Sequence, residues 1–186
     1  MKRILLAVFS LLFFAANQSF AYNVSHFTND DKVLEALKVL DRAGAEEVLE
    51  NLDEKSVKII FYDLTMIDFN YSKDYAITSV NTMGNRYILL NSRYQNSPKE
   101  AIACLITHES FHKLNKATFK EEVQCTQKEA EYWHKLKNQV TSSVTNDLTN
   151  RLNRLENLYL ISSPENNKIA DSIFHNQFYR GQLAME

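Results

Sequence analysis

The chain has 186 residues, with 21 Lys or Arg against 23 Asp or Glu, and therefore a formal net charge of −2. This length fits one compact domain, and a hydrophobic content of 45% excludes a wholly disordered chain. The near-neutral balance provides no basic excess for phosphate contacts, so we expect no nucleic-acid partner.

The N-terminal segment, residues 1–21, has the pattern of a secretory signal peptide. Two basic residues precede an apolar run over residues 4–16, and Ser19 and Ala21 occupy the small-residue positions before a cleavage site. As a helix this run would cover about 20 Å, short of the roughly 30 Å hydrocarbon core that a transmembrane anchor must cross. We therefore expect residues 1–21 to be removed, and the mature protein to be secreted or periplasmic with no stable membrane insertion.

One helical segment and three strands are predicted next along the chain. Residues 30–51 carry apolar side chains at helical spacing, interrupted at Gly44. Strands are expected where β-branched and aromatic residues concentrate, at 57–62, 75–80 and 86–91. A glycine between the last two strands predicts a hairpin turn.

A well-marked helix start follows the strands. Ser97 and Glu100 have the spacing of a capping box, and Pro98 suits the first helical position. The apolar residues that follow then face a core. The helix that begins here is predicted to run through residues 108–112.

The rest of the chain is predicted to be helical almost throughout. Further helices are expected over residues 120–131, 140–160 and 169–183, and Trp133 is expected in the core. Only three Gly and two Pro are present, which argues against a turn-rich sandwich or barrel. The elements together predict one α+β domain over residues 22–186, mostly helical, with a short three-stranded sheet before the helix that contains residues 108–112.

Residues 108–112 read His-Glu-Ser-Phe-His, the H-E-x-x-H pattern. Residues four apart on a helix share one face, so the imidazoles of His108 and His112 can bind one ion. Catalytic zinc takes three protein ligands and keeps a fourth position for water. Glu109 lies beside the first His, where it can take a proton from that water and pass it to a leaving amine. The alternative is a chance match, with both His side chains merely packed or solvated.

A third ligand is expected downstream of the motif. No His follows at the spacing of an H-E-x-x-H-x-x-G-x-x-H site, because position 118 is Thr. A carboxylate is therefore the remaining choice. The segment 113–120 is long enough to turn back and set the next helix antiparallel to the first.

An H-E-x-x-H helix followed by Glu on the next helix resembles the gluzincin metallopeptidases, particularly the small ones. The resemblance covers residues 86–133, under half of the mature chain. It implies a zincin-like fold and a Zn²⁺ ion held by His108, His112 and Glu122. It also implies that Glu109 is the general base.

Two other carboxylates could replace the implied third ligand. Glu129 lies two turns further along the same helix face, and Glu121 is the next alternative. Most of the acidic residues of this helix are expected simply to form a solvated face. Many gluzincins place an Asp four residues after the ligand Glu to orient a His. Here that position is Thr126.

The same resemblance implies how a peptide would bind. In proteins of this kind an edge strand above the metal pairs with the substrate backbone. The strand at 86–91 is nearest the motif in sequence, and the strand at 75–80 is the alternative edge. A donor to the tetrahedral intermediate is also needed, and the candidates are Tyr132, His134, Tyr159, His175 and Tyr179.

The two cysteines flank the expected metal ligands. If His108 and Glu122 meet on antiparallel helices, Cys104 and Cys125 are displaced in the same direction and are expected to approach each other. An exported protein permits a disulfide, which would tie the two helices together. The alternative is a pair of buried free thiols.

These observations predict an exported zinc-dependent metallopeptidase that hydrolyses a peptide or protein substrate. A zinc-bound water activated by Glu109 would attack the peptide carbonyl. The alternative is a catalytically inactive exported domain, either zinc-binding or a structural or interaction module whose C-terminal helices contact a partner.

Overall fold

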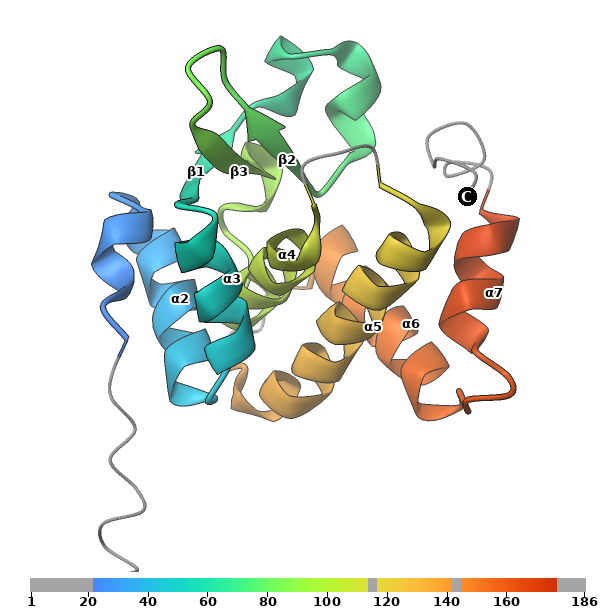
Figure 1. Ribbon diagram of the computed structural model, residues 1–186. Coiled ribbons are helices and arrows are strands. Elements are labelled where there is room, and N and C mark those ends of the chain that lie inside the picture. The colour runs from blue at the N-terminus through green and yellow to red at the C-terminus, as the bar shows by residue number, and fades with distance from the viewer. Residues whose placement is uncertain (1–21, 114–116, 142–144, 177–186) are drawn as a thin grey trace, which may run out of the picture.

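The computed structural model describes residues 22–113, 117–141 and 145–176 (Figure 1). The predicted signal peptide, residues 1–21, lies outside the described residues. Within the described part of the chain, no helix combines the length and apolar character needed to cross a membrane.

The predicted N-terminal helical segment forms two helices, α2 (Asp31–Arg42) and α3 (Glu46–Glu54). Asp30 caps α2, because its carboxylate accepts hydrogen bonds from two backbone N–H groups of the first turn. Gly44 separates the helices with φ of 67°, in the left-handed region that glycine adopts without strain. The break therefore falls where the sequence pattern placed it.

Three strands form one small sheet, β1 (Lys58–Tyr62), β2 (Ala76–Val80) and β3 (Arg86–Asn91). The order is β1–β3–β2, with β1 parallel and β2 antiparallel to β3. Gly84, with φ of 82°, completes the predicted hairpin turn between β2 and β3. Because β3 is the central strand, the strand at 86–91 cannot be the edge strand that would pair with a peptide. The strand at 75–80, the alternative considered from the sequence, is an edge strand of the sheet.

Four helices complete the regular structure, α4 (Lys99–Phe111), α5 (Phe119–Leu136), α6 (Asp147–Leu160) and α7 (Lys168–His175). Figure 1 shows α2 and α3 on one side of α4, with α5, α6 and α7 on the other. Short 3₁₀ helices occupy η1 (Val24–Phe27), η2 (Leu64–Met66), η3 (Phe69–Lys73), η4 (Ser92–Tyr94) and η5 (Lys137–Gln139). The chain is an α+β domain, as its patterns predict.

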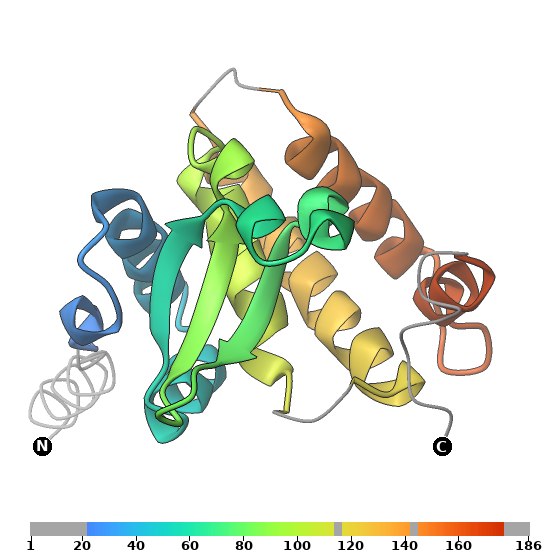
Figure 2. The same cartoon turned by 90° about the horizontal axis from the view of Figure 1, so that it is seen from above.

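Helix α4 is the centre of the hydrophobic core. Every residue from Glu100 to Ser110 is buried, because α2, α3 and α5 pack around the helix and the sheet covers it. In Figure 2 the sheet lies across α4, with α6 and α7 beyond α5. A helix that is apolar on all faces, as over residues 101–106, is suited to this central place.

The predicted capping box at the start of α4 is wrong. The helix begins at Lys99 with Pro98 as its N-cap, and no side chain caps it. The hydroxyl of Ser97 instead accepts a hydrogen bond from the side-chain amide of Asn146 at 2.7 Å. Asn146 is the N-cap of α6, so Ser97 links the starts of two helices that are distant in sequence.

Candidate metal centre

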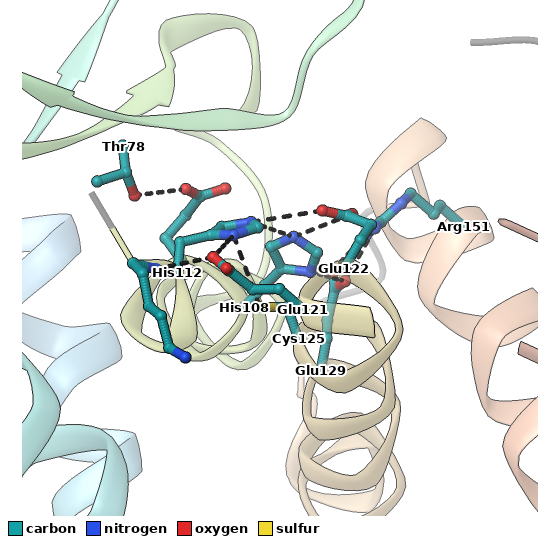
Figure 3. Close-up of polar contacts among 10 residues, drawn as sticks. Thr78, His108, His112, Glu121, Glu122, Cys125, Glu129 and Arg151 are labelled. Carbon is teal, nitrogen blue, oxygen red and sulfur yellow. Dashed lines mark hydrogen bonds and ion pairs between the residues drawn. The ribbon is translucent and has the colours of Figure 1, made fainter. Parts of the chain in front are cut away.

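His108, His112 and Glu122 lie together where α4 meets the first turn of α5 (Figure 3). The two imidazole Nε2 atoms are 3.1 Å apart. The Glu122 carboxylate places one oxygen 3.4 Å from Nε2 of His108 and the other 3.6 Å from Nε2 of His112. Two ligand atoms bound to one tetrahedral zinc ion would lie about 3.3 Å apart. The three side chains therefore fit a single metal ion.

The end of α4 positions the two imidazoles. The helix ends at Phe111, and His112 is its C-cap, so both His side chains still emerge on one face. The Lys55 ammonium donates hydrogen bonds to the carbonyl groups of Ser110 and His112, at 2.5 and 3.0 Å. These bonds satisfy carbonyl groups that the helix end leaves without intrahelical partners.

The start of α5 positions the carboxylates. The hydroxyl of Thr118 accepts a hydrogen bond from the backbone N–H of Glu121 and caps the helix. Glu121 and Glu122 therefore lie in the first turn, where the helix dipole favours negative charge. Helix α5 runs antiparallel to α4, as predicted, because Glu121 contacts His112 whereas Glu129 contacts His108.

The two alternative third ligands lie behind the imidazoles rather than beside Glu122. Glu129 contacts Nδ1 of His108 at 3.1 Å, and Glu121 contacts Nδ1 of His112 at 3.1 Å. A carboxylate that accepts the Nδ1–H leaves the Nε2 lone pair directed at the metal position. The structure therefore groups Glu122 with the two His residues and gives Glu129 and Glu121 an orienting role.

Thr126, which replaces the Asp common in gluzincins, does not orient a His. It is 2% exposed, and its hydroxyl has no hydrogen-bond partner among the described residues. Glu129, one turn further along α5, contacts His108 instead. Arg151 of α6 binds both oxygens of the Glu129 carboxylate and holds it in place.

The electrostatic field of the centre favours a bound cation. Burial lowers the pKa of His108, but the carboxylates of Glu122 and Glu129 outweigh it and raise this pKa to about 10. Burial alone would raise the pKa of Glu129, but Arg151 and His108 lower it. The carboxylates around the imidazoles are Glu109, Glu121, Glu122 and Glu129, and Arg151 offsets one of these charges. A divalent ion would neutralise most of the remaining charge.

Glu109 lies beside the metal-ligand group without belonging to it. It follows His108 in α4, is 7% exposed, and lines the same cleft as the three ligands. One of its oxygens accepts a hydrogen bond from the hydroxyl of Thr78 at 2.8 Å. Thr78 belongs to β2, so the edge strand holds the carboxylate predicted to act as the base.

A cleft of about 740 Å³ opens over the ligand group. One wall is β2, and the opposite wall is formed by α6 and α7, with apolar side chains from Leu155, Leu158 and Ile173. His108, His112 and Glu122 line its base. The edge strand and the candidate metal ligands therefore face one space that is large enough for several peptide residues.

The sequence-based candidates for the oxyanion donor do not line this cleft where they are described. Tyr132 is 7% exposed in the core, and His134 pairs with Glu156 at 2.7 Å. Tyr159 packs against a small apolar cluster of Ala130, Ile169 and Ile173, and His175 bonds the backbone of its own helix. Tyr179 lies outside the described residues. Trp133 is buried, as predicted.

Other donors line the cleft, and sequence reasoning missed them. They are Tyr71 before the edge strand and Arg151 and Arg154 on α6. The spacing of the two arginines places them on one face of a helix. The spacing alone does not show which other element this helix face contacts, so the sequence did not indicate that the two arginines line a cleft.

The predicted disulfide is not formed, and both cysteines are buried free thiols. The Cys125 sulfur lies 3.7 Å from Nδ1 of His112, whereas the charge of Glu129 acts on Cys104. Eight residues of helix separate Cys104 from His112, a rise of about 12 Å. The two thiols therefore lie at different levels of the helix pair, and burial raises the pKa of each.

No protein-family model, curated protein or solved structure matches this chain. The likeness to gluzincins is therefore limited to the H-E-x-x-H helix and the Glu on the helix after it.

Proposed function

We propose that this protein is an exported zinc-dependent metallopeptidase with a zincin-like active-site arrangement. The observation that carries the proposal is the convergence of two imidazole nitrogens and the Glu122 carboxylate within 3.6 Å of one another. Glu109 lies beside this group and faces the same cleft. Export is supported by the sequence pattern of residues 1–21.

The donor set favours zinc over other divalent ions. Two imidazoles and one carboxylate are typical ligands of catalytic zinc, whereas magnesium and calcium prefer oxygen ligands alone. Each imidazole has a carboxylate on its other nitrogen, as metal-binding His residues commonly do. Three protein ligands leave room for a water in the fourth position.

The chemistry is divided between the ion and the protein. Bound zinc would lower the pKa of a coordinated water and polarise the scissile carbonyl. Glu109 would accept the proton of that water and deliver it to the leaving amine. The hydrogen bond from Thr78 holds one carboxylate oxygen, so that the other remains available for proton transfer.

The free edge of β2 supports a peptide substrate. Among the described residues, β2 pairs only with β3, and its other edge borders the cleft. An extended peptide can add to such an edge through backbone hydrogen bonds. Four of the five β2 residues line the cleft. A peptide bound to this edge would lie next to Glu109 and the candidate metal ligands, which line the same cleft.

Measuring zinc content and peptide hydrolysis together tests the proposal. The mature protein should bind about one zinc ion per chain and cleave members of a mixed peptide library. Chelation should abolish cleavage, and added zinc should restore it. The double variant His108→Ala/His112→Ala should lose both metal and activity. Absence of zinc even after refolding with the ion, or cleavage that survives chelation, would contradict the assignment.

A second candidate is a zinc-binding domain without turnover. The observation that favours it is the absence of the described oxyanion candidates from the cleft lining. This candidate predicts one bound zinc ion that is lost in the double variant, but no hydrolysis of any library peptide. The same measurement therefore separates the two functions.

Replacing Thr78 by Val should lower kcat about tenfold, because a hydrogen bond to a charged group contributes roughly 1.5–3 kcal/mol. Valine keeps the shape of the side chain and removes only the hydroxyl that positions Glu109. Zinc content and KM should change little. Ser79→Ala, the neighbouring change on β2, is the control. An unchanged kcat for Thr78→Val would show that this hydrogen bond does not serve the reaction.

A further inference from the structure

Asp74 is held at the entrance to the edge strand. Its backbone N–H donates to the carbonyl of Tyr71, and its own carbonyl accepts a hydrogen bond from the side chain of Asn91 at 2.9 Å. These bonds fix the residue between η3 and β2. Its side chain is half-buried and lines the same cleft as the candidate metal ligands.

The carboxylate of Asp74 has no partner within the described part of the chain. No described side chain or backbone group forms a hydrogen bond or ion pair with it. Burial and the charge of Glu109 raise the pKa of Asp74 to about 6, and no cation lowers it. The more deeply buried Glu129 differs, since Arg151 and His108 both pair with it.

The cationic side chains that line the cleft do not pair with the Asp74 carboxylate. Lys73, Lys113, Arg151 and Arg154 line the same space, yet none of them pairs with Asp74. An unpaired carboxylate removed from part of its water is destabilising unless a donor reaches it. The donor that suits a carboxylate best is an ammonium or guanidinium group. The described residues supply none, so this half-buried carboxylate is left to water or to a cationic group of a molecule that binds in the cleft.

We propose that Asp74 binds a cationic group of the substrate, so that the enzyme selects peptides with an ammonium or guanidinium near the cleaved bond. The inference rests on the proposed peptidase function. Asp74 lies two residues before the start of β2, the strand that would bind the peptide, and it lines the same cleft as Glu109. The cation is either the N-terminal ammonium or a Lys or Arg side chain.

Two matched sets of peptides test the selection and its source. One set exchanges Lys for norleucine at each position in turn, and the other compares free with acetylated N-termini. The wild-type protein should prefer the cationic member in kcat/KM by at least about tenfold, a modest effect for a charge pair at a partly buried site. The set that shows the preference identifies which cation Asp74 binds.

The variant Asp74→Asn should reduce this preference to about twofold or less, because the amide keeps the shape and removes the charge. Asp31→Asn, an exposed change at the start of α2, is the matched control and should keep the preference. Equal cleavage of cationic and neutral peptides by the wild type, or a preference that survives Asp74→Asn, would overturn the inference.

A binding measurement keeps the two proposals distinguishable. If no peptide is cleaved, the peptidase function fails, and the affinity of the zinc-loaded protein for the same peptides is measured by calorimetry. Affinity for the cationic peptide that falls at least about tenfold in Asp74→Asn would still support the role of Asp74. Equal affinities of wild type and variant would reject it.

Discussion

Replacing Glu109 by Gln is expected to lower kcat/KM for peptide hydrolysis by about 10² to 10⁴ while the protein keeps its zinc ion. The amide has the size of the carboxylate, which matters because Glu109 is 7% exposed in the central helix. Its carbonyl oxygen can still accept the hydrogen bond from Thr78. Only the ability to take a proton from water is removed.

Zinc content, thermal unfolding and kcat/KM should be measured on the same preparations. Glu50→Gln, an exposed change on α3, provides a control for loss of one carboxylate far from the cleft. Full activity in Glu109→Gln would exclude this residue as the base. Loss of zinc would instead show that Glu109 helps to hold the metal, although it does not belong to the group of three candidate ligands.

The second large effect is expected at Glu129, which is fully buried and binds Arg151 through both carboxylate oxygens. Replacing it by Ala should lower the free energy of unfolding by about 3–5 kcal/mol, because a largely buried ion pair is broken and the guanidinium loses both bonds to this carboxylate. His108 also loses the acceptor of its Nδ1–H. Urea unfolding of the zinc-free protein measures the loss without the contribution of the metal.

Two further variants separate the structural role of Glu129 from its effect on the metal. Glu129→Ala/Arg151→Met removes both charges of this ion pair and should recover part of the lost stability. Glu129→Gln keeps the side-chain shape and should weaken zinc binding by about 10- to 100-fold, as losses of groups behind metal ligands do. A destabilisation below about 1 kcal/mol in Glu129→Ala would contradict the buried ion pair.

Most elements of the fold could be predicted because their signals are local. The break at Gly44 and the hairpin at Gly84 follow from backbone conformations that glycine adopts readily. The strands follow from runs of β-branched and aromatic residues. The start of α4 shows the limit of local signals, because the hydroxyl of Ser97 bonds Asn146 rather than its own helix.

Part of the candidate site could be predicted for the same reason. Helical spacing alone places His108 and His112 on one face, whatever surrounds the helix. The short connection after them brings the next helix back, so a carboxylate such as Glu122 could be anticipated as the third ligand. The role of Glu109 as the base could be predicted because it is adjacent to the first His in the sequence.

Only the tertiary structure decided how the elements meet. Strand order made β2 the edge, and it brought Thr78 to Glu109 and Asp74 to the cleft. The axial offset between α4 and α5 placed Glu129 behind His108 and kept Cys125 away from Cys104. The sequence by itself determined the periodicity of each element, since that depends on a few neighbouring residues. Rotation and offset between elements depend on how all side chains pack at once.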